Sequence, residues 1–151
     1  MPSVVYNTHE RTHDLFDHLH EIDKKDWVAV GACMRSVYGL YRGHAYTILG
    51  AHVVHDHDGK QWKLIRMRNP HGKSRYNGPW SDRDRHRMTD RIKKAIGHTH
   101  EDDGIFLIPV EYWRRAFTRY YVAMYQDWKT TTHINTLSKR IHHFYFSSSV
   151  D

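Results

Sequence analysis

Two side chains in the first half of the sequence have types and a spacing that suit proton transfer. His44 directly follows Gly43, and Asn69 comes at the end of a later apolar segment. The two apolar segments flank a polar turn that contains Asp58-Gly59, a dipeptide typical of tight hairpins. A hairpin brings its ends together, so we expect the imidazole to lie near the carboxamide. In thiol hydrolases a histidine takes the thiol proton, and an amide oxygen orients its ring. A histidine and an asparagine in ordinary turns are the alternative interpretation.

The strands and helices that must position this pair can be predicted from hydrophobic periodicity. Strands are expected at 27–33, 44–54, 61–68, 104–109 and 119–128, after an extended lead-in at 1–6. Helices are expected at 12–25 and 81–96, with a short helical turn at 110–117.

Local signals refine these boundaries. Thr12 is the expected N-cap of the first helix, and Ser81 with Asp84 resembles a capping box for the second, which should stop at Gly97. Gly50, inside the strand at 44–54, indicates a bulge or a close approach by another backbone. We therefore predict an α+β domain, mainly an antiparallel β-sheet with peripheral helices.

Composition narrows the classes of partner and compartment. The chain has 151 residues, a net charge of +6 and 15 histidines. Its single cysteine favours a reducing, intracellular and cytoplasmic setting, with a cytoskeletal or organellar assembly as a variant. The first residues lack the apolar stretch of a secretory signal, and no membrane association is expected. Because the basic residues are scattered, nucleic-acid binding is disfavoured, although a basic module for acidic surfaces remains a third functional class.

Four sequence segments occur in an order and at a spacing known from one enzyme family. They are GLYRGHAYTILGA, KLIRMRNPHG, YNGPWSD and EDDGIFLIPVEYWRRAFTRYYVAMY. Over residues 14–126 the chain closely resembles the second, β-rich half of the protease core of the calpain family of cysteine proteases. The resemblance implies a papain-like half-domain over 1–128, starting near the N-terminal helix, with 129–151 as a C-terminal extension. It also implies that His44 matches the catalytic histidine and Asn69 the catalytic asparagine.

The resemblance also shows where this chain departs from an active protease. In the family the nucleophile lies at a helix N-terminus in the other subdomain, in a Gly-x-Cys-Trp motif that this sequence does not contain. Cys33, in WVAVGACMRS, is expected to be an inert core thiol with a raised pKa. A tryptophan that shields the His–Asn hydrogen bond in the family is replaced by His71, which shields less and could compete for that bond.

The family's calcium site is also altered in this sequence. Asp82 and Asp103 match two of its acidic positions, whereas Arg75 and Ile105 stand at two others. A calcium ion needs several oxygen ligands, so we expect these two aspartates to be remnants of the site, calcium binding to be lost or very weak, and no other cofactor.

A histidine-rich turn leaves two interpretations open. The segment His55–Asp58 could hold a transition metal, joined by His142 and His143 if the tail folds back. A polar turn without a metal is the alternative.

These observations predict a calpain-like domain without peptidase activity, acting as a structural or protein-binding component of a larger assembly. One half of a split calcium-dependent cysteine endopeptidase, with the cysteine supplied by another chain, is the alternative. Four aromatic residues are expected near the open face around His44, where a protein partner in a multi-protein complex or a cytoskeletal assembly would cover them. They are Tyr41, Tyr46, Trp80 and Trp113. The extension at 129–151 packs on its own domain or docks on a partner.

Overall fold

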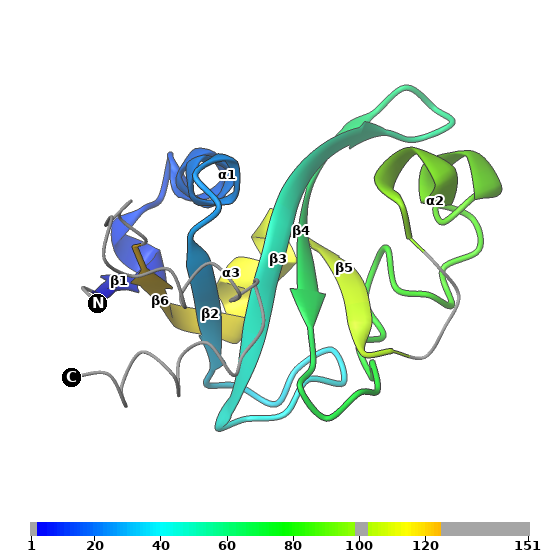
Figure 1. Cartoon of the computed structure of the whole chain (residues 1–151). Coiled ribbons are helices and arrows are strands. Elements are labelled where there is room, and N and C mark those ends of the chain that lie inside the picture. Colours follow the sequence, from blue (N-terminus) through cyan, green and yellow to red (C-terminus); the bar gives the residue numbers. More distant parts are fainter. Residues whose placement is uncertain (1–2, 99–102, 125–151) are drawn as a thin grey trace, which may run out of the picture.

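The computed structural model describes residues 3–98 and 103–124, which form one six-stranded sheet with helices around it (Figure 1). The strands are β1 (Ser3–Asn7), β2 (Val28–Cys33), β3 (His44–His55), β4 (Gln61–Arg68), β5 (Ile105–Pro109) and β6 (Phe117–Ala123). The helices are α1 (Leu15–Lys24), α2 (Asp90–Ile96) and α3 (Val110–Ala116), with a short 3-10 turn, η1, at Thr8–Glu10. The predicted tail at 129–151 lies outside the described residues.

All neighbouring strands in the sheet run antiparallel, in the order β1-β6-β2-β3-β4-β5. The predicted α+β class is thus confirmed. β3 and β4 form the predicted hairpin, and the register between them shifts between Ile48 and Gly50. A Cβ atom at Gly50 would lie 3.1 Å from a carboxylate oxygen of Asp23 in α1. The glycine therefore marks a bulge, as predicted, and the close neighbour is a side chain of the helix.

An aromatic cluster fills the core between α3 and the centre of the sheet. Trp113 stacks on Phe117 with ring centroids 5.0 Å apart, and Phe117 meets Tyr46 edge to face at 5.5 Å. Gly31 in β2 gives these rings room, because a Cβ atom there would lie 2.9 Å from the ring of Phe117. In Figure 1, α1 lies beside β2 and β3, whereas α2 lies at the opposite side of the sheet, beyond β5.

Two helix starts were predicted wrongly. The first helix begins at Leu15, and Thr12 does not cap it. The second begins at Asp90, where Thr89 is the N-cap and accepts a hydrogen bond from the Ile92 amide. Residues 81–89 form turns instead. The predicted stop at Gly97 is confirmed by its left-handed φ of 67°.

Two half-buried histidines give the fold a predicted pH dependence. Burial, with Arg11 near His18 and Arg66 near His52, holds the pKa of both imidazoles below the usual value of 6.5. Between that value and the lower folded-state pKa, the unfolded chain binds more protons, so stability falls as the pH falls below 6.5.

Urea unfolding at about pH 7.5 and about pH 5 measures this loss of stability. His52→Gln should reduce the loss, whereas His9→Gln, at an exposed position, should leave it unchanged. Equal pH dependence in the wild type and His52→Gln would contradict the assignment to His52.

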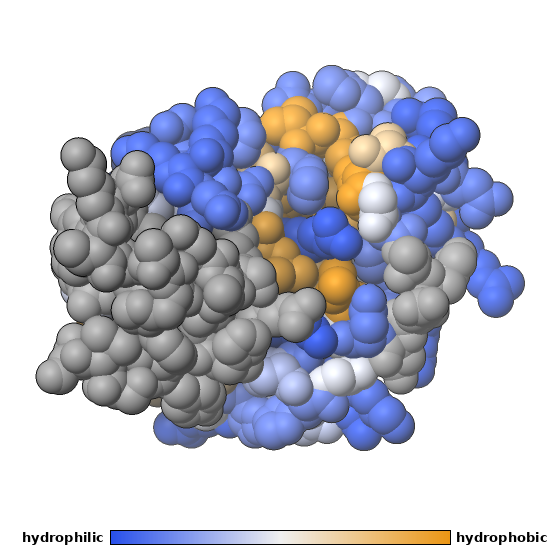
Figure 2. All heavy atoms as spheres, in the orientation of Figure 1, coloured by the Kyte–Doolittle hydropathy of each residue, from blue (hydrophilic) through white to orange (hydrophobic). Residues whose placement is uncertain are grey.

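No helix in the described part of the chain is both long and apolar enough to cross a membrane. Figure 2 shows that hydrophilic side chains surround an apolar area over the middle of the face seen in Figure 1, where β3 and β4 run.

Candidate functional site

His44 is the first residue of β3 and directly follows the loop that connects β2 to β3. Gly43, with a φ of 80°, turns the chain into the strand and donates its amide to the carbonyl of Cys33 at 2.7 Å. The imidazole of His44 is half-buried between two rings, with centroids 5.5 Å from Tyr41 and 5.2 Å from His71. Two loops thus each contribute one ring neighbour to His44.

Asn69 follows β4 and is buried, but its carboxamide is bonded within its own loop. Its oxygen accepts the backbone N–H of His71 at 3.0 Å, and its nitrogen donates to the carbonyl of Lys73 at 2.8 Å. Its backbone N–H donates to Gly104 at 2.9 Å. No hydrogen bond joins the side chains of His44 and Asn69, both of which the structure describes.

The hairpin nevertheless brings the predicted pair into one region. The register pairs Thr47 with Arg68, so the start of β3 lies beside the loop that follows β4. His71, at the position where the resemblance implies a shielding tryptophan, is exposed. Its ring meets the His44 ring edge to face. Its backbone N–H, and not its ring, donates a hydrogen bond to the carboxamide oxygen of Asn69. The catalytic roles of His44 and Asn69 stay predictions.

Cys33 lies directly opposite His44 in the β2–β3 register. Its side chain is fully buried, and its Sγ donates to the carbonyl of Arg35 at 3.2 Å. Burial raises the pKa of this thiol. A thiol that is buried, protonated and hydrogen-bonded to the backbone is a poor nucleophile, as the sequence predicted.

The calcium positions implied by the resemblance do not fit a calcium ion in this chain. Asp82 pairs with His98, with Oδ1 and Nε2 2.7 Å apart. Asp103 accepts the amide of Ile105 at 3.0 Å, in a turn of its own. Arg75, which stands at a third position of the implied site, is exposed. Among the residues that the structure describes, two aspartates that already have partners, with Arg75 and Ile105 at two other positions, supply too few oxygen ligands.

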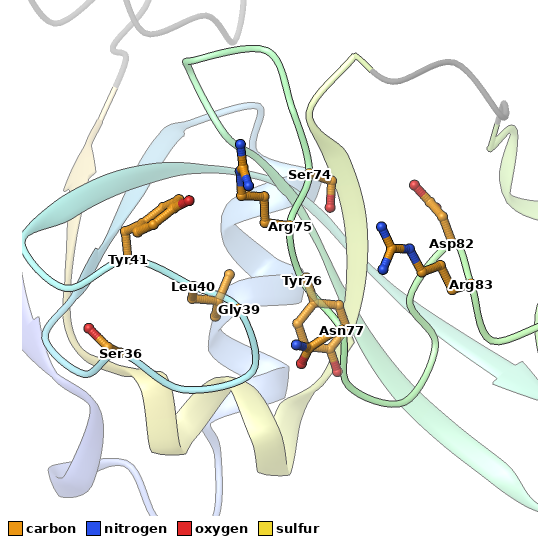
Figure 3. Close-up of a pocket in the computed structure, with 10 residues that line it drawn as sticks. All are labelled: Ser36, Gly39, Leu40, Tyr41, Ser74, Arg75, Tyr76, Asn77, Asp82 and Arg83. Atoms are coloured by element: carbon orange, nitrogen blue, oxygen red, sulfur yellow. The ribbon is translucent and has the colours of Figure 1, made fainter.

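Sequence reasoning did not anticipate a pocket of about 540 Å³ between two loops (Figure 3). One loop contributes Gly39 and Tyr41, and the other contributes Arg75 and Asn77. Figure 3 shows Arg83 and Asp82 entering from the segment before α2. The amide of Asn77 donates to the carbonyl of Tyr38 at 2.9 Å and ties the loops together. The lining is polar and adjoins the His44 region through Tyr41.

The aromatic residues around His44 were predicted only in part. Tyr41 is 43% exposed, as expected for an open face. Tyr46, Trp80 and Trp113 are buried to 2% exposure or less, so placing them at that face was wrong. They fill the core instead, and Met34, at 47% exposure, is the other large apolar side chain exposed in these loops.

The hydrogen bonds of Asn69 predict a structural role that can be measured. Asn69→Ala removes the partners of the His71 amide and the Lys73 carbonyl, and should cost roughly 1–3 kcal/mol of unfolding free energy. Asn77→Ala, at an exposed side chain, is the matched control and should cost little. Chemical denaturation compares the two variants. Equal stability would show that the carboxamide does not hold the loop.

Comparison with known proteins places this geometry in a family. The family model described as "Calpain family cysteine protease" matches residues 2–124. Calpain-9 of Rattus norvegicus is 42% identical over 87 residues, which cover 56% of this chain and 12% of that protein. Calpain-9 of Mus musculus is 49% identical over 74 residues, with coverage of 48% and 11%. Calpain clp-1 of Caenorhabditis elegans is 37% identical over 84 residues, with coverage of 54% and 11%.

Among solved structures, SERA5E from Plasmodium falciparum overlaps with 81% of this chain and 46% of that chain, at 14% identity and a TM-score of 0.38. The chain spans about a tenth of the length of the curated relatives named above. The family match nevertheless covers every strand and helix of the sheet described here, from β1 to β6. The chain therefore belongs to the calpain family of cysteine proteases.

Proposed function

We propose that this calpain-like domain is a non-catalytic component that binds another protein through the face around His44. The observation that carries the proposal is the bonding of Asn69, whose carboxamide oxygen and nitrogen both have partners in its own loop. A general base needs its imidazole held in one tautomer by such a group. Cys33 offers no substitute nucleophile within these 151 residues, because it is buried and its thiol pKa is raised.

The exposed apolar side chains of the same loops support a protein partner. Met34 and Tyr41 are 47% and 43% exposed, and the Tyr41 ring contacts His44. Aromatic residues and methionine are enriched at the centres of protein interfaces. The cations Arg42 and Arg75, both exposed, border this surface and favour an acidic rim on the partner. The expected setting is an intracellular multi-protein complex or a cytoskeletal assembly.

The size of the native assembly tests the proposed surface. Tagged full-length chain from its own cells should elute as a large species. Met34→Asp with Tyr41→Asp should shift it to the size of the free chain. The matched control is Val5→Asp with Val53→Asp, at 52% and 47% exposure on β1 and β3, and it should leave the assembly intact. If both double variants elute alike, the face around His44 is not the interface.

Peptidase assays test the non-catalytic part of the proposal. The purified chain should not cleave unfolded protein substrates, and His44→Ala should change nothing. Turnover that is lost in His44→Ala but kept in His71→Ala would overturn the proposal, because both variants remove one ring of the same contact.

A second candidate is half of a split cysteine endopeptidase, favoured by the half-exposed ring of His44 at the end of β3. A thiol from another chain would give its proton to the imidazole and attack the peptide carbonyl, and the imidazolium would then protonate the leaving amine. Asn69 would first have to release a loop partner to orient the ring. The calcium dependence of such an enzyme would have to come from the other chain, because Arg75 and Ile105 replace ligands here.

A thiol-reactive peptide probe separates the two candidates. Applied to the co-purified complex, it should label a partner cysteine only if the split enzyme exists, and His44→Ala should then abolish labelling. An intact complex that stays unlabelled supports the binding role.

A further inference from the structure

Three exposed side chains with metal-binding atoms meet at the tip of the β3–β4 hairpin. His57 and Asp58 lie in the turn between the two strands, and His86 lies in the segment before α2. Their ligand atoms all lie within 4.8 Å of one another. Figure 1 shows this turn reaching over toward α2, which explains how residues distant in sequence meet. Within residues 3–98 and 103–124, no other group of three such side chains is gathered this closely.

The geometry of the cluster is close to that of a metal site. The Nε2 atom of His57 lies 3.4 Å from Oδ2 of Asp58. Two ligands of a tetrahedral zinc ion, with bonds of about 2.0–2.2 Å, lie roughly 3.3–3.6 Å apart. The rings of His57 and His86 are 4.3 Å apart and perpendicular, so rotation of exposed side chains suffices to bring a third ligand atom to that spacing.

The turn that carries two of the ligands is held rigidly. Asp56 Oδ1 accepts the amides of Asp58 and Lys60, each at 2.9 Å. Its other oxygen accepts the indole N–H of Trp62 at 2.8 Å. A ligand set on a fixed backbone loses less entropy when an ion binds.

The segment that carries His86 is also held, and the neighbouring cations have partners of their own. Asp84 accepts the Trp80 amide and the Arg87 guanidinium, both at 2.9 Å. The Lys60 ammonium lies 4.2 Å from the centre of the Trp62 ring, and Arg87 lies 5.3 Å from it. The ion pair with Asp84 offsets the charge of Arg87, whereas the Trp62 ring holds the Lys60 side chain in place without removing its charge.

We propose that His57, Asp58 and His86 bind a divalent transition-metal ion, zinc foremost, with water completing its coordination. Two imidazoles and one carboxylate suit zinc, copper or nickel, whereas calcium and magnesium require more oxygen ligands. The sequence offered His57 and Asp58 as possible ligands, but it did not point to His86, which is far from the turn along the chain. It is separate from Asp82 and Asp103, which the family resemblance connects with calcium.

Calorimetric titration of the full chain with zinc chloride tests the site. The wild type should show one tight site, and His57→Ala with His86→Ala should weaken it about 100-fold or more, since even outer partners of a metal site contribute roughly 10–100-fold. The matched control is His9→Ala with His13→Ala, which removes two exposed histidines elsewhere and should keep the site.

The histidine ring resonances identify the ligands directly. At the first equivalent of zinc, the signals of His57 and His86 should shift together, while those of His9 and His13 should not. Equal zinc affinity in both double variants, or a first equivalent that shifts other histidines, would overturn the proposal.

Discussion

Replacing Gly39 by alanine is expected to lower the free energy of unfolding by about 3–5 kcal/mol, whereas Gly43→Ala should lower it by about 1–2 kcal/mol. Both glycines have left-handed backbones, with φ values of 78° and 80°, so alanine is strained at each. The difference lies in the space around them. A Cβ atom at Gly39 would collide with the carbonyl oxygen of Arg75, whereas a Cβ atom at Gly43 would meet nothing within 4 Å.

The collision at Gly39 involves backbone, so it cannot be relieved by rotating a side chain. The loop containing Arg75 would have to move, which would strain the hydrogen bond between the Asn77 amide and the Tyr38 carbonyl. The pocket in Figure 3 should open as a result. Denaturant unfolding of both variants measures the contrast, with Gly43→Ala as the control for backbone strain. Similar losses in the two variants would show that the loops do not pack as described.

The β3–β4 hairpin could be predicted because its signals are local. The Asp58-Gly59 turn and the apolar segments on either side fix the pairing, and Gly50 marks the bulge that the register shift confirms. The hairpin alone brings the start of β3 beside the loop after β4. The segments that lie next to His44 could therefore be predicted from the sequence.

The helix start at 81 was predicted wrongly because a side chain competes with the helix. The Asp84 carboxylate accepts the amide of Trp80, outside the predicted helix, and also binds Arg87. The segment between Arg83 and Arg87 has no apolar face to bury. Turns therefore satisfy its backbone hydrogen-bonding groups as well as a helix would. The helix begins only at Asp90, where the hydroxyl of Thr89 caps it.

The sequence could not predict the hydrogen bonds of the Asn69 side chain, nor the contact between His57 and His86. The first depends on the backbone path from 69 to 73, which no periodicity encodes. The second depends on how the segment before α2 folds back over the hairpin. Burial of Trp80 and Trp113 is equally a product of long-range packing. Local patterns predict elements, whereas site chemistry here depends on contacts between them.

Trp113→Ala should lower the free energy of unfolding by about 3–5 kcal/mol. Trp113 is fully buried, stacks on Phe117 and meets Tyr120 at 5.8 Å. Its indole N–H points to the sulfur of Met67 at 3.4 Å. Trp27→Ala is the matched control, because Trp27 is only half-buried at the edge of the core. It should cost about 1 kcal/mol, in proportion to the smaller apolar area removed.

Removing the Trp113 side chain should also affect the loop before His44. Phe117 packs against Tyr46, and the Tyr46 hydroxyl accepts the amide of Tyr41 at 3.1 Å. Loosening this stack should speed hydrogen exchange at the Tyr41 amide in Trp113→Ala more than in Trp27→Ala, under conditions where both variants remain folded. Unchanged exchange at Tyr41 would show that the loop is held independently of the core. Faster exchange there would mean that the same aromatic cluster that stabilises the sheet also positions the proposed binding face.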